Sequence, residues 1–310
     1  MARYVLRRAL QSLYAVLMLL LIVFAMTRLT GDPTNQYLPL SASPQARADF
    51  AALHGFNDPY YVQFIRYVSD LAHGDFGQSL FKQRPAMEVA LEAFPITLTL
   101  AFFTMSIALV LSIVLGSLAA MRPNGRFDRM ISPLTIFTAS APTFWVALVA
   151  IFVFAMMLGW VPTSGMGTPA HWILPVCVLV LTPLGVLTQV VRSSMVSSLS
   201  APYAKTALAK GASDARVVFV HALRNSLLPL ITIAGVQATG LVNGAVVIET
   251  IFGFPGIGKV MIDSIRDRDF SLTIACILLA AVVVYAMNVA IDIMYARLDP
   301  RVQIGGEARR

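Results

Sequence analysis

One stretch of the sequence has the spacing of a phosphate-binding loop. Residues 253–259 read GFPGIGK, which matches the pattern G-x-x-x-x-G-K that cradles nucleotide phosphates with backbone N–H groups and a lysine. The next residue is Val260, which has no hydroxyl to offer to a magnesium ion, and the motif follows a long apolar run in place of a buried strand. These departures argue against nucleotide binding, and the stretch predicts a tight re-entrant turn built from Pro255 and three glycines.

A second group of polar and small residues lies in one apolar run of the second half of the chain. Gln237, Gly240 and Gly244 fall on one face of a helix by their spacing, and Asn243 lies roughly a third of a turn away. Glu249 stands at the end of the run. These five residues are the candidates for lining a polar path. A plain interhelical hydrogen bond explains Gln237 equally well, and close helix packing is the favoured explanation of the two glycines.

The last apolar run carries polar residues at three- and four-residue steps, which predicts a shared face and a structural polar clasp: Tyr285, Asn288, Asp292 and Tyr295. The middle of every apolar run lacks Asp, Glu, Lys, Arg and His. Ion-coupled carriers place such residues near mid-membrane to bind or relay the coupling ion. Their absence argues against an ion-coupled mechanism, so any transport must take its energy elsewhere.

Enzymatic chemistry has little support in the sequence. Neither the zinc motif H-E-x-x-H nor the nucleophile motif G-x-S-x-G occurs, so we assign no catalytic residue. His171 has no second His, Cys or carboxylate at ligand spacing, and we expect no metal site. A membrane-embedded enzyme is therefore the weakest of the alternatives.

The composition is that of a membrane protein. Of the 310 residues 57% are apolar and only 13% are charged, whereas soluble domains average about 25% charged residues. The net charge of +7 does not indicate a nucleic-acid surface, because the basic residues are scattered at the ends of apolar runs. We therefore expect an all-α polytopic protein in a lipid membrane, with no nucleic-acid partner.

Six apolar runs reach the length of about 20 residues that a helix needs to cross a bilayer. They cover residues 10–29, 96–120, 131–157, 173–192, 230–251 and 271–295. Most of the 23 Lys and Arg residues fall on the side that holds both termini, so the positive-inside rule predicts that both termini are cytoplasmic. The predicted organisation is an N-terminal spanning helix (1–30), an extracytoplasmic segment with two short helices (31–95), a five-helix core (96–295) and a cytoplasmic tail (296–310).

We expect the two short helices of the extracytoplasmic segment to start at Ser43-Pro44 and at Asp58-Pro59. The second has one apolar face, expected to pack on the outer ends of the spanning helices or to dock an external partner: Tyr61, Phe64, Ile65, Val68 and Leu71.

One cytoplasmic loop, residues 200–229, is longer and more charged than a bare connection requires. Its sequence predicts two short helices broken at Gly211. Ser200 is expected to cap the first, with Pro202 in its opening turn, and Ser213 to cap the second. A capped helix pair in a loop of an apolar chain predicts contact with a partner.

The same loop resembles the EAA loop of ATP-binding-cassette importer permeases, through ALAKG at 207–211, HALRN at 221–225 and Leu228-Pro229. Four further stretches narrow the resemblance to the oligopeptide/dipeptide (peptide/nickel) family, B-type subunit: HGDFGQS at 73–79, PTFW at 142–145, ETIF through PGIG at 249–258, and Asp292 through Asp299-Pro300-Arg301. The acidic residue that names the EAA loop is absent, and Thr206 stands near its place. We still expect the loop to dock on a partner without that acid, but we do not expect a salt bridge at this position.

The resemblance implies the fold of a type I ABC importer permease in a prokaryotic inner membrane. It implies a second homologous permease subunit, two ATPase subunits that bind ATP and magnesium, and an extracytoplasmic solute-binding protein, with no cofactor in this chain. The residues it places at the ATPase contact are Thr206, Ala207, Lys210, Gly211, Ala212 and Ser213. The implied cargo is a di- or oligopeptide. Other solutes of the family (glutathione, nickel chelates, sugars) remain alternatives, and an ion-coupled transporter is a more distant one.

Overall fold

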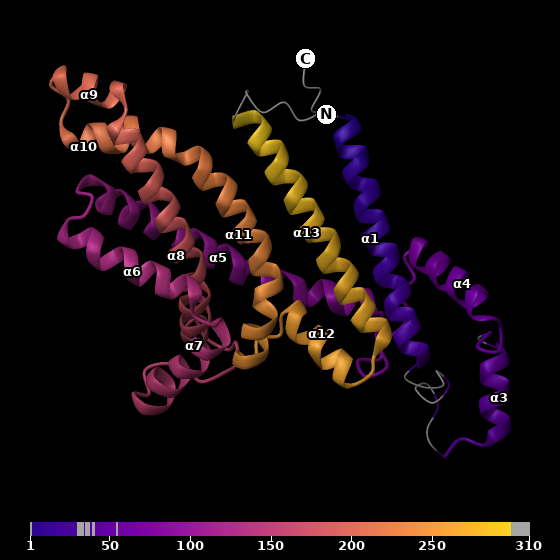
Figure 1. The fold of residues 1–310 in the computed structure, drawn as a ribbon. Helices are drawn as coiled ribbons and strands as arrows, with labels where there is room; N and C mark the ends of the chain where they lie inside the picture. Colours follow the sequence, from indigo (N-terminus) through magenta and orange to yellow (C-terminus); the bar gives the residue numbers. More distant parts are fainter. Residues whose placement is uncertain (1, 30–33, 35–37, 39–40, 54, 299–310) are drawn as a thin grey trace. The chain divides into compact units, whose positions relative to one another are not determined.

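The computed structural model describes residues 2–29, 34, 38, 41–53 and 55–298, and this part of the chain is helical, with no β-strand (Figure 1). The chain divides into two compact units. Unit 1 comprises residues 1–95 and 259–285, and unit 2 comprises residues 96–258 and 286–310. The predicted all-α fold is confirmed, whereas the predicted segment boundaries at residues 30 and 295 stay predictions.

Unit 1 contains α1 (Ala2–Leu29), α3 (Pro44–Leu53), α4 (Tyr60–Ala72) and parts of α5 (Ala86–Met121), α12 (Ile257–Arg266) and α13 (Phe270–Leu298). The two short helices α3 and α4 begin where the sequence predicts, at Ser-Pro and Asp-Pro. The Ser43 hydroxyl accepts the Ala46 N–H at 3.1 Å, which caps α3. Gly55 and Gly74, which follow the two helices, have positive φ values of 65° and 84°.

The predicted apolar face of α4 is only partly correct. Phe64 and Leu71 pack against a buried cluster that includes Leu20 of α1, as predicted. The Phe24 ring also contacts the Phe64 ring, with 5.3 Å between centroids. Tyr61 and Ile65, which share the predicted face, are exposed instead. The helix is turned so that its polar residue Gln63 is buried.

Unit 2 contains the C-terminal part of α5, α6 (Arg126–Ser140), α7 (Thr143–Ala150), the π-helix η1 (Ile151–Met157), α8 (Ala170–Ser200), α9 (Pro202–Ala209), α10 (Asp214–Arg216), the π-helix η2 (Val217–Ala222), α11 (Leu223–Phe252) and the end of α13. Its core forms where α8 packs on α11 and on α6. Gly185 lets α8 and α6 meet closely, since a Cβ there would lie 2.4 Å from the Thr135 carbonyl oxygen.

Within the described residues four helices are long and apolar enough to cross a membrane, and up to six spans result if each of two bent helix pairs counts as one. The four are Ala86–Met121, Ala170–Ser200, Leu223–Val242 and Phe270–Ile291. A shorter apolar helix, Leu13–Ala25, lies at the place of the first predicted span.

The predicted span at residues 131–157 is bent, and it counts as one membrane span only if both helices of the bent pair are taken together. α6 and the α7–η1 helix meet at an angle of 102°. Pro142 causes the break, because the residue before a proline is driven away from the helical region. Ala141 accordingly has φ −68° and ψ 131°.

Candidate functional site

The helix α9, which carries much of the predicted partner contact, starts at a proline. Pro202 occupies its first position, as predicted, and Ala201 before it is extended, with φ −70° and ψ 153°. The predicted cap by Ser200 is wrong. Its hydroxyl donates to the Val196 carbonyl at 2.9 Å, within the last turn of α8. Proline geometry, and not a side-chain cap, therefore begins this helix.

The chain leaves α9 through Gly211, as predicted. The Gly211 N–H donates to the Leu208 carbonyl at 2.9 Å and the Ala212 N–H to the Ala207 carbonyl at 3.1 Å, which is the Schellman pattern of helix ends. Gly211 has φ +82°, and no atom lies within 4 Å of the position that a Cβ would take. Glycine is required here by backbone conformation and not by crowding.

The second helix of the loop is not a separate element, which corrects the prediction of two short helices. Ser213 does cap its start, because the Arg216 N–H donates to the Ser213 hydroxyl at 3.4 Å. From there α10 continues through the π-helix η2 directly into α11. The backbone stays helical at both ends of η2, with φ −68° and ψ −38° at Arg216 and φ −60° and ψ −42° at Leu223. The loop is one short helix beside an extended α11.

Most of the predicted contact residues of this loop lie at its surface. Thr206, Lys210, Gly211 and Ser213 are exposed, and Ala207 and Ala212 are partly buried. Sequence reasoning missed an apolar set that is also exposed: Tyr203, Leu208, Phe219 and Val220. Their presence in an otherwise polar loop was the available signal, because apolar side chains left exposed together mark contact surfaces.

The predicted pathway residues separate into two environments. A Cβ on Gly240 or on Gly244 would meet nothing within 4 Å, so no helix of the described chain packs on this face of α11. Gln237 is partly buried. Asn243 lies in α11, but its side chain is outside the described residues, as are those of Asp292 and Tyr295 from the predicted polar clasp of the last span.

Glu249 does not line an open face, which corrects its prediction as a pathway residue. Its carboxylate is fully buried at the end of α11. The Thr97 hydroxyl of α5 donates to Oε1 at 2.5 Å, and the Gly258 N–H donates to Oε2 at 2.8 Å. The Ile257 N–H in turn donates to the Thr97 hydroxyl at 3.0 Å. We call this network, formed by Thr97, Glu249, Ile257 and Gly258, the carboxylate clasp.

Two glycines of the GFPGIGK turn leave the space that the carboxylate clasp occupies. A Cβ on Gly256 would lie 2.3 Å from the Glu249 carboxylate carbon, and one on Gly258 would lie 2.5 Å from the Val246 Cα. The turn therefore holds a carboxyl group at the start of a helix with one backbone N–H group, that of Gly258, whereas a phosphate-binding loop holds a phosphate with several. The group that it holds is the protein's own Glu249 side chain, and the predicted tight turn is confirmed.

Comparison with known proteins identifies the chain. Residues 112–304 match the family model described as "Binding-protein-dependent transport system inner membrane component". The chain belongs to this family. The oligopeptide transport system permease protein AppB of Bacillus subtilis is 36% identical over 98% of this chain and 100% of its own length. The glutathione transport system permease protein GsiC of Salmonella paratyphi A is 35% identical over 98% and 99%.

Solved structures give the fold of this permease. The MetNI methionine ABC transporter in an inward-facing conformation matches with a TM-score of 0.58 at 18% identity, covering 69% of this chain and 98% of that one. An amino acid ABC transporter matches with a TM-score of 0.55 at 15% identity, covering 68% and 94%. The predicted fold of an ABC importer permease is thereby confirmed.

An ion pair joins α6 to α8 in the permease. Asp128, which is buried, accepts a two-pronged contact from the Arg192 guanidinium, with 2.7 Å between Nη2 and Oδ2. The Asn124 N–H and the Ser132 hydroxyl also donate to this carboxylate, at 2.8 and 3.0 Å. This pairing could not be predicted from the sequence, because residues 64 positions apart share no helix face.

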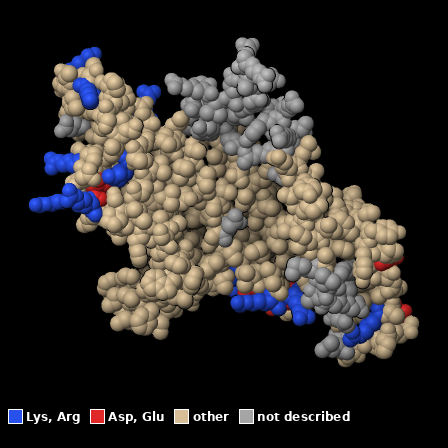
Figure 2. Space-filling model, in the orientation of Figure 1, with Lys and Arg blue, Asp and Glu red and all other residues tan. Residues whose placement is uncertain are grey.

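Basic side chains gather at the same end of unit 2. Figure 2 shows Lys and Arg over α9 and over the turn between α5 and α6. The exposed members are Arg122, Arg126, Arg129, Lys205 and Lys210. Among the described residues no group of three or more His, Cys, Asp or Glu could hold a metal ion.

Proposed function

We propose that this permease is the transmembrane subunit of an ATP-driven importer of di- and oligopeptides, in which it forms half of the pathway with a second, homologous subunit. The support comes from relatives named for peptide transport, which align end to end. AppB, named for oligopeptide transport, is matched over 100% of its length, and the di/tripeptide permease DppB of Pseudomonas aeruginosa is 37% identical over 93% of its length. Glutathione, which GsiC is named for, is the alternative solute that the test below separates from di- and oligopeptides.

The observation that carries the coupling mechanism is the continuity of α10, η2 and α11. In this proposal α9 and the turn at Gly211 dock on one of two ATPase subunits, which bind ATP and magnesium. The contact residues are Thr206, Ala207, Lys210, Gly211, Ala212 and Ser213. Because α9 packs on α8 and η2, and η2 continues into α11, closure of the ATPases moves spanning helices as a rigid body.

The pathway runs along α11 in this proposal. Gly240 and Gly244 present an open face that either lines the path or receives a helix of the second permease subunit. Gln237 supplies a polar group next to that face, and Asn243 stays a candidate from its sequence position. Glu249 is left out of the path, because its carboxylate is used by the clasp.

The orientation in this proposal places both termini and the loop 200–229 in the cytoplasm. The exposed basic residues of α9 and of the turn between α5 and α6 support it through the positive-inside rule. The segment 31–95 then faces outward, where an extracytoplasmic binding protein delivers the solute.

The test is co-purification of the permease with its partner subunits, followed by reconstitution in nanodiscs. We expect a peptide-loaded binding protein to stimulate ATP hydrolysis, and glutathione, a nickel chelate or a sugar on its own binding protein to fail. Stimulation by one of those solutes in place of peptides would contradict the peptide assignment. Uptake driven by an ion gradient without ATP would contradict the importer mechanism itself.

A further inference from the structure

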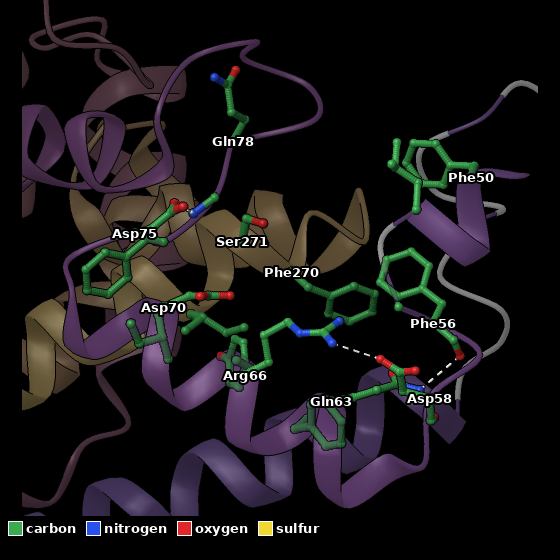
Figure 3. Close-up of a pocket in the computed structure, with 18 of the residues that line it drawn as sticks. Phe50, Phe56, Asp58, Gln63, Arg66, Asp70, Asp75, Gln78, Phe270 and Ser271 are labelled. Atoms are coloured by element: carbon green, nitrogen blue, oxygen red, sulfur yellow. Dashed lines mark hydrogen bonds and ion pairs between the residues drawn. The ribbon is translucent and has the colours of Figure 1, made fainter.

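Unit 1 contains a pocket of about 960 Å³, a volume in the range of small-molecule sites. One face of α4 forms its polar wall, and α3 with the turn after it, the loop 75–78 and the start of α13 complete the enclosure (Figure 3). Aromatic side chains supply much of the apolar lining: Phe24, Phe50, Phe56, Tyr67, Phe76 and Phe270. None of these residues belongs to the loop 200–229 or to the predicted pathway residues of α11.

A buried acceptor in this wall lacks a donor. Gln63 is only 6% exposed, and its amide nitrogen donates to the Phe56 and Asp58 carbonyls at 2.9 and 2.7 Å. Those two contacts fix which end of the amide is nitrogen, because carbonyls only accept. The amide oxygen, Oε1, is buried and has no hydrogen-bond partner among the described residues. Buried polar atoms are rarely left unpaired in this way, so we expect a bound molecule to donate a hydrogen bond to Gln63 Oε1.

A second unpaired group lies one helical turn further along. The Tyr67 hydroxyl is also buried without a partner among the described residues. Burial raises the pKa of this phenol, so it stays neutral and can donate or accept. Gln63 and Tyr67 are four residues apart, which on a helix separates their Cβ atoms by about 5–6 Å. Both residues therefore lie on the same side of α4, and both line the pocket.

The charges around the pocket favour a cation. Three carboxylates line it, those of Asp58, Asp70 and Asp75, against the single guanidinium of Arg66. The Arg66 Nη2 atom lies 2.9 Å from Asp58 Oδ2, and the Asp75 carboxylate accepts the Gly77 N–H at 2.8 Å. The Asp70 carboxylate has no hydrogen bond or ion pair with a described residue, and in Figure 3 it lies apart from the Asp58 carboxylate that Arg66 contacts.

The cation is organic and not a metal ion. Among the described residues no three carboxylates, histidines or cysteines are close enough to hold a metal. Aromatic rings, in contrast, attract an ammonium through their faces and accept the apolar group attached to it. The unpaired atoms at Gln63 and Asp70 are acceptors, which suits a group that carries only N–H donors.

We propose that this pocket binds a primary ammonium group carried on an apolar body. The ammonium donates to Gln63 Oε1, the Tyr67 hydroxyl and the Asp70 carboxylate, and the body packs on the Phe56 and Phe270 rings. Two molecules have this chemistry: the amino terminus of a peptide with its first side chain, and the headgroup of phosphatidylethanolamine. The peptide source rests on the proposed function, whereas the pocket chemistry does not.

The experiment uses the whole transporter complex in nanodiscs of phosphatidylcholine and phosphatidylglycerol, without binding protein. The probe is phenylalanyl-alanine with a fluorophore on its carboxyl end, and anisotropy reports binding. We expect N-acetylation of the probe to weaken binding roughly tenfold or more, because it removes a charge-assisted contact. Asp70→Asn should weaken it by a similar factor and Tyr67→Phe a few-fold. The control Asp267→Asn, an exposed carboxylate outside the pocket, should leave binding unchanged.

The lipid arm repeats the measurement in nanodiscs that contain phosphatidylethanolamine. If that lipid displaces the probe from the wild type, the headgroup is a ligand of the same site; if it does not, the peptide amino terminus is the source. Equal binding of the acetylated probe, or an Asp70→Asn variant that matches the control, overturns the proposal. A third result also overturns the proposal, and it has two parts. The probe fails to bind in the nanodiscs that lack phosphatidylethanolamine, and phosphatidylethanolamine does not change the thermal stability of the wild type relative to Asp70→Asn.

A separate readout keeps this proposal distinct from the proposed function. ATP hydrolysis is measured in the same nanodiscs with peptide-loaded binding protein. Stimulated hydrolysis without pocket binding refutes only the pocket. Pocket binding without stimulation by any peptide refutes only the peptide importer.

Discussion

The helices α9 and α11 end in the same local motif but in opposite surroundings. Both close with a Schellman pattern, at Gly211 and at Gly253, whose φ values are +82° and +66°. Beyond Gly211 the space is open. Beyond Gly253 the chain folds back until Gly256 and Gly258 press against Glu249 and its helix. The same helix end serves as an exposed corner in one place and as the entry to a buried network in the other.

This difference shows how a turn that fixes structure differs from a turn that offers a surface. In the carboxylate clasp, the Glu249 oxygens and the Thr97 hydroxyl have partners inside the chain. Around Gly211, polar and apolar side chains such as Lys210 and Leu208 stay exposed. We interpret the first as an internal brace and the second as a docking corner, and four variants test the contrast.

Glu249→Ala should give the largest effect. It leaves the Thr97 hydroxyl and the Gly258 N–H buried without their acceptor, which costs about 2–6 kcal/mol of unfolding free energy at about 1–3 kcal/mol for each group. Denaturant unfolding of the purified complex measures this loss. Glu249→Gln retains an acceptor and a donor and should lose less than half as much. Equal stability of both variants and the wild type would show that the clasp is no brace.

Asp128→Ala should have the next largest effect on stability. It removes the carboxylate that receives Arg192, at a cost of about 1–3 kcal/mol. The cost stays moderate because the Arg192 side chain is 25% exposed and water partly replaces the lost partner. The matched control is Asp263→Ala, which breaks the more exposed pair with Lys259 and should cost under about 1 kcal/mol. If Asp263→Ala lowers the free energy of unfolding as much as Asp128→Ala does, burial of the Asp128–Arg192 pair adds no stability.

Gly211→Val should have a small effect on stability and a large one on coupling. A β-branched residue at positive φ is strained by about 1–2 kcal/mol, but no neighbouring atom clashes with it. We expect normal membrane insertion, basal ATP hydrolysis by the assembled complex, and loss of peptide uptake driven by that hydrolysis. Gly211→Asn is the control, because asparagine tolerates this conformation. Normal uptake by the valine variant would remove the corner from the coupling mechanism.

Thr206→Glu should have the smallest effect. Thr206 is exposed, and its hydroxyl donates a hydrogen bond to the Pro202 carbonyl of its own helix at 2.9 Å. If the corner docks by shape, restoring the missing acid changes ATPase affinity by less than about fivefold, in line with exposed ion pairs worth about 0.2–1 kcal/mol. Thr206→Lys provides the opposite charge in the same assay. Opposite tenfold shifts in the two variants would show that charge governs docking.

Local chemistry determined what the sequence predicted correctly. Pro202 starts α9, Ser213 caps α10, and Gly211 takes a positive φ, all from interactions within a few residues. The apolar runs predicted helices because a backbone in lipid must satisfy its hydrogen bonds within the segment. Composition and motif order also carried the family, because they need no knowledge of which residues meet in space.

The structure alone decided what depends on distant partners. Glu249 looked like a polar residue at a pathway end until Thr97, which is 152 positions away in the sequence, met its carboxylate. Likewise, Gln63 became buried because α4 turned its Phe64 side toward α1, which periodicity could not specify. The sequence by itself determined helices, topology signals and turns, since these follow from backbone chemistry. The tertiary structure decided which glycine faces open space and which faces a carboxylate, since that depends on what the rest of the chain brings there.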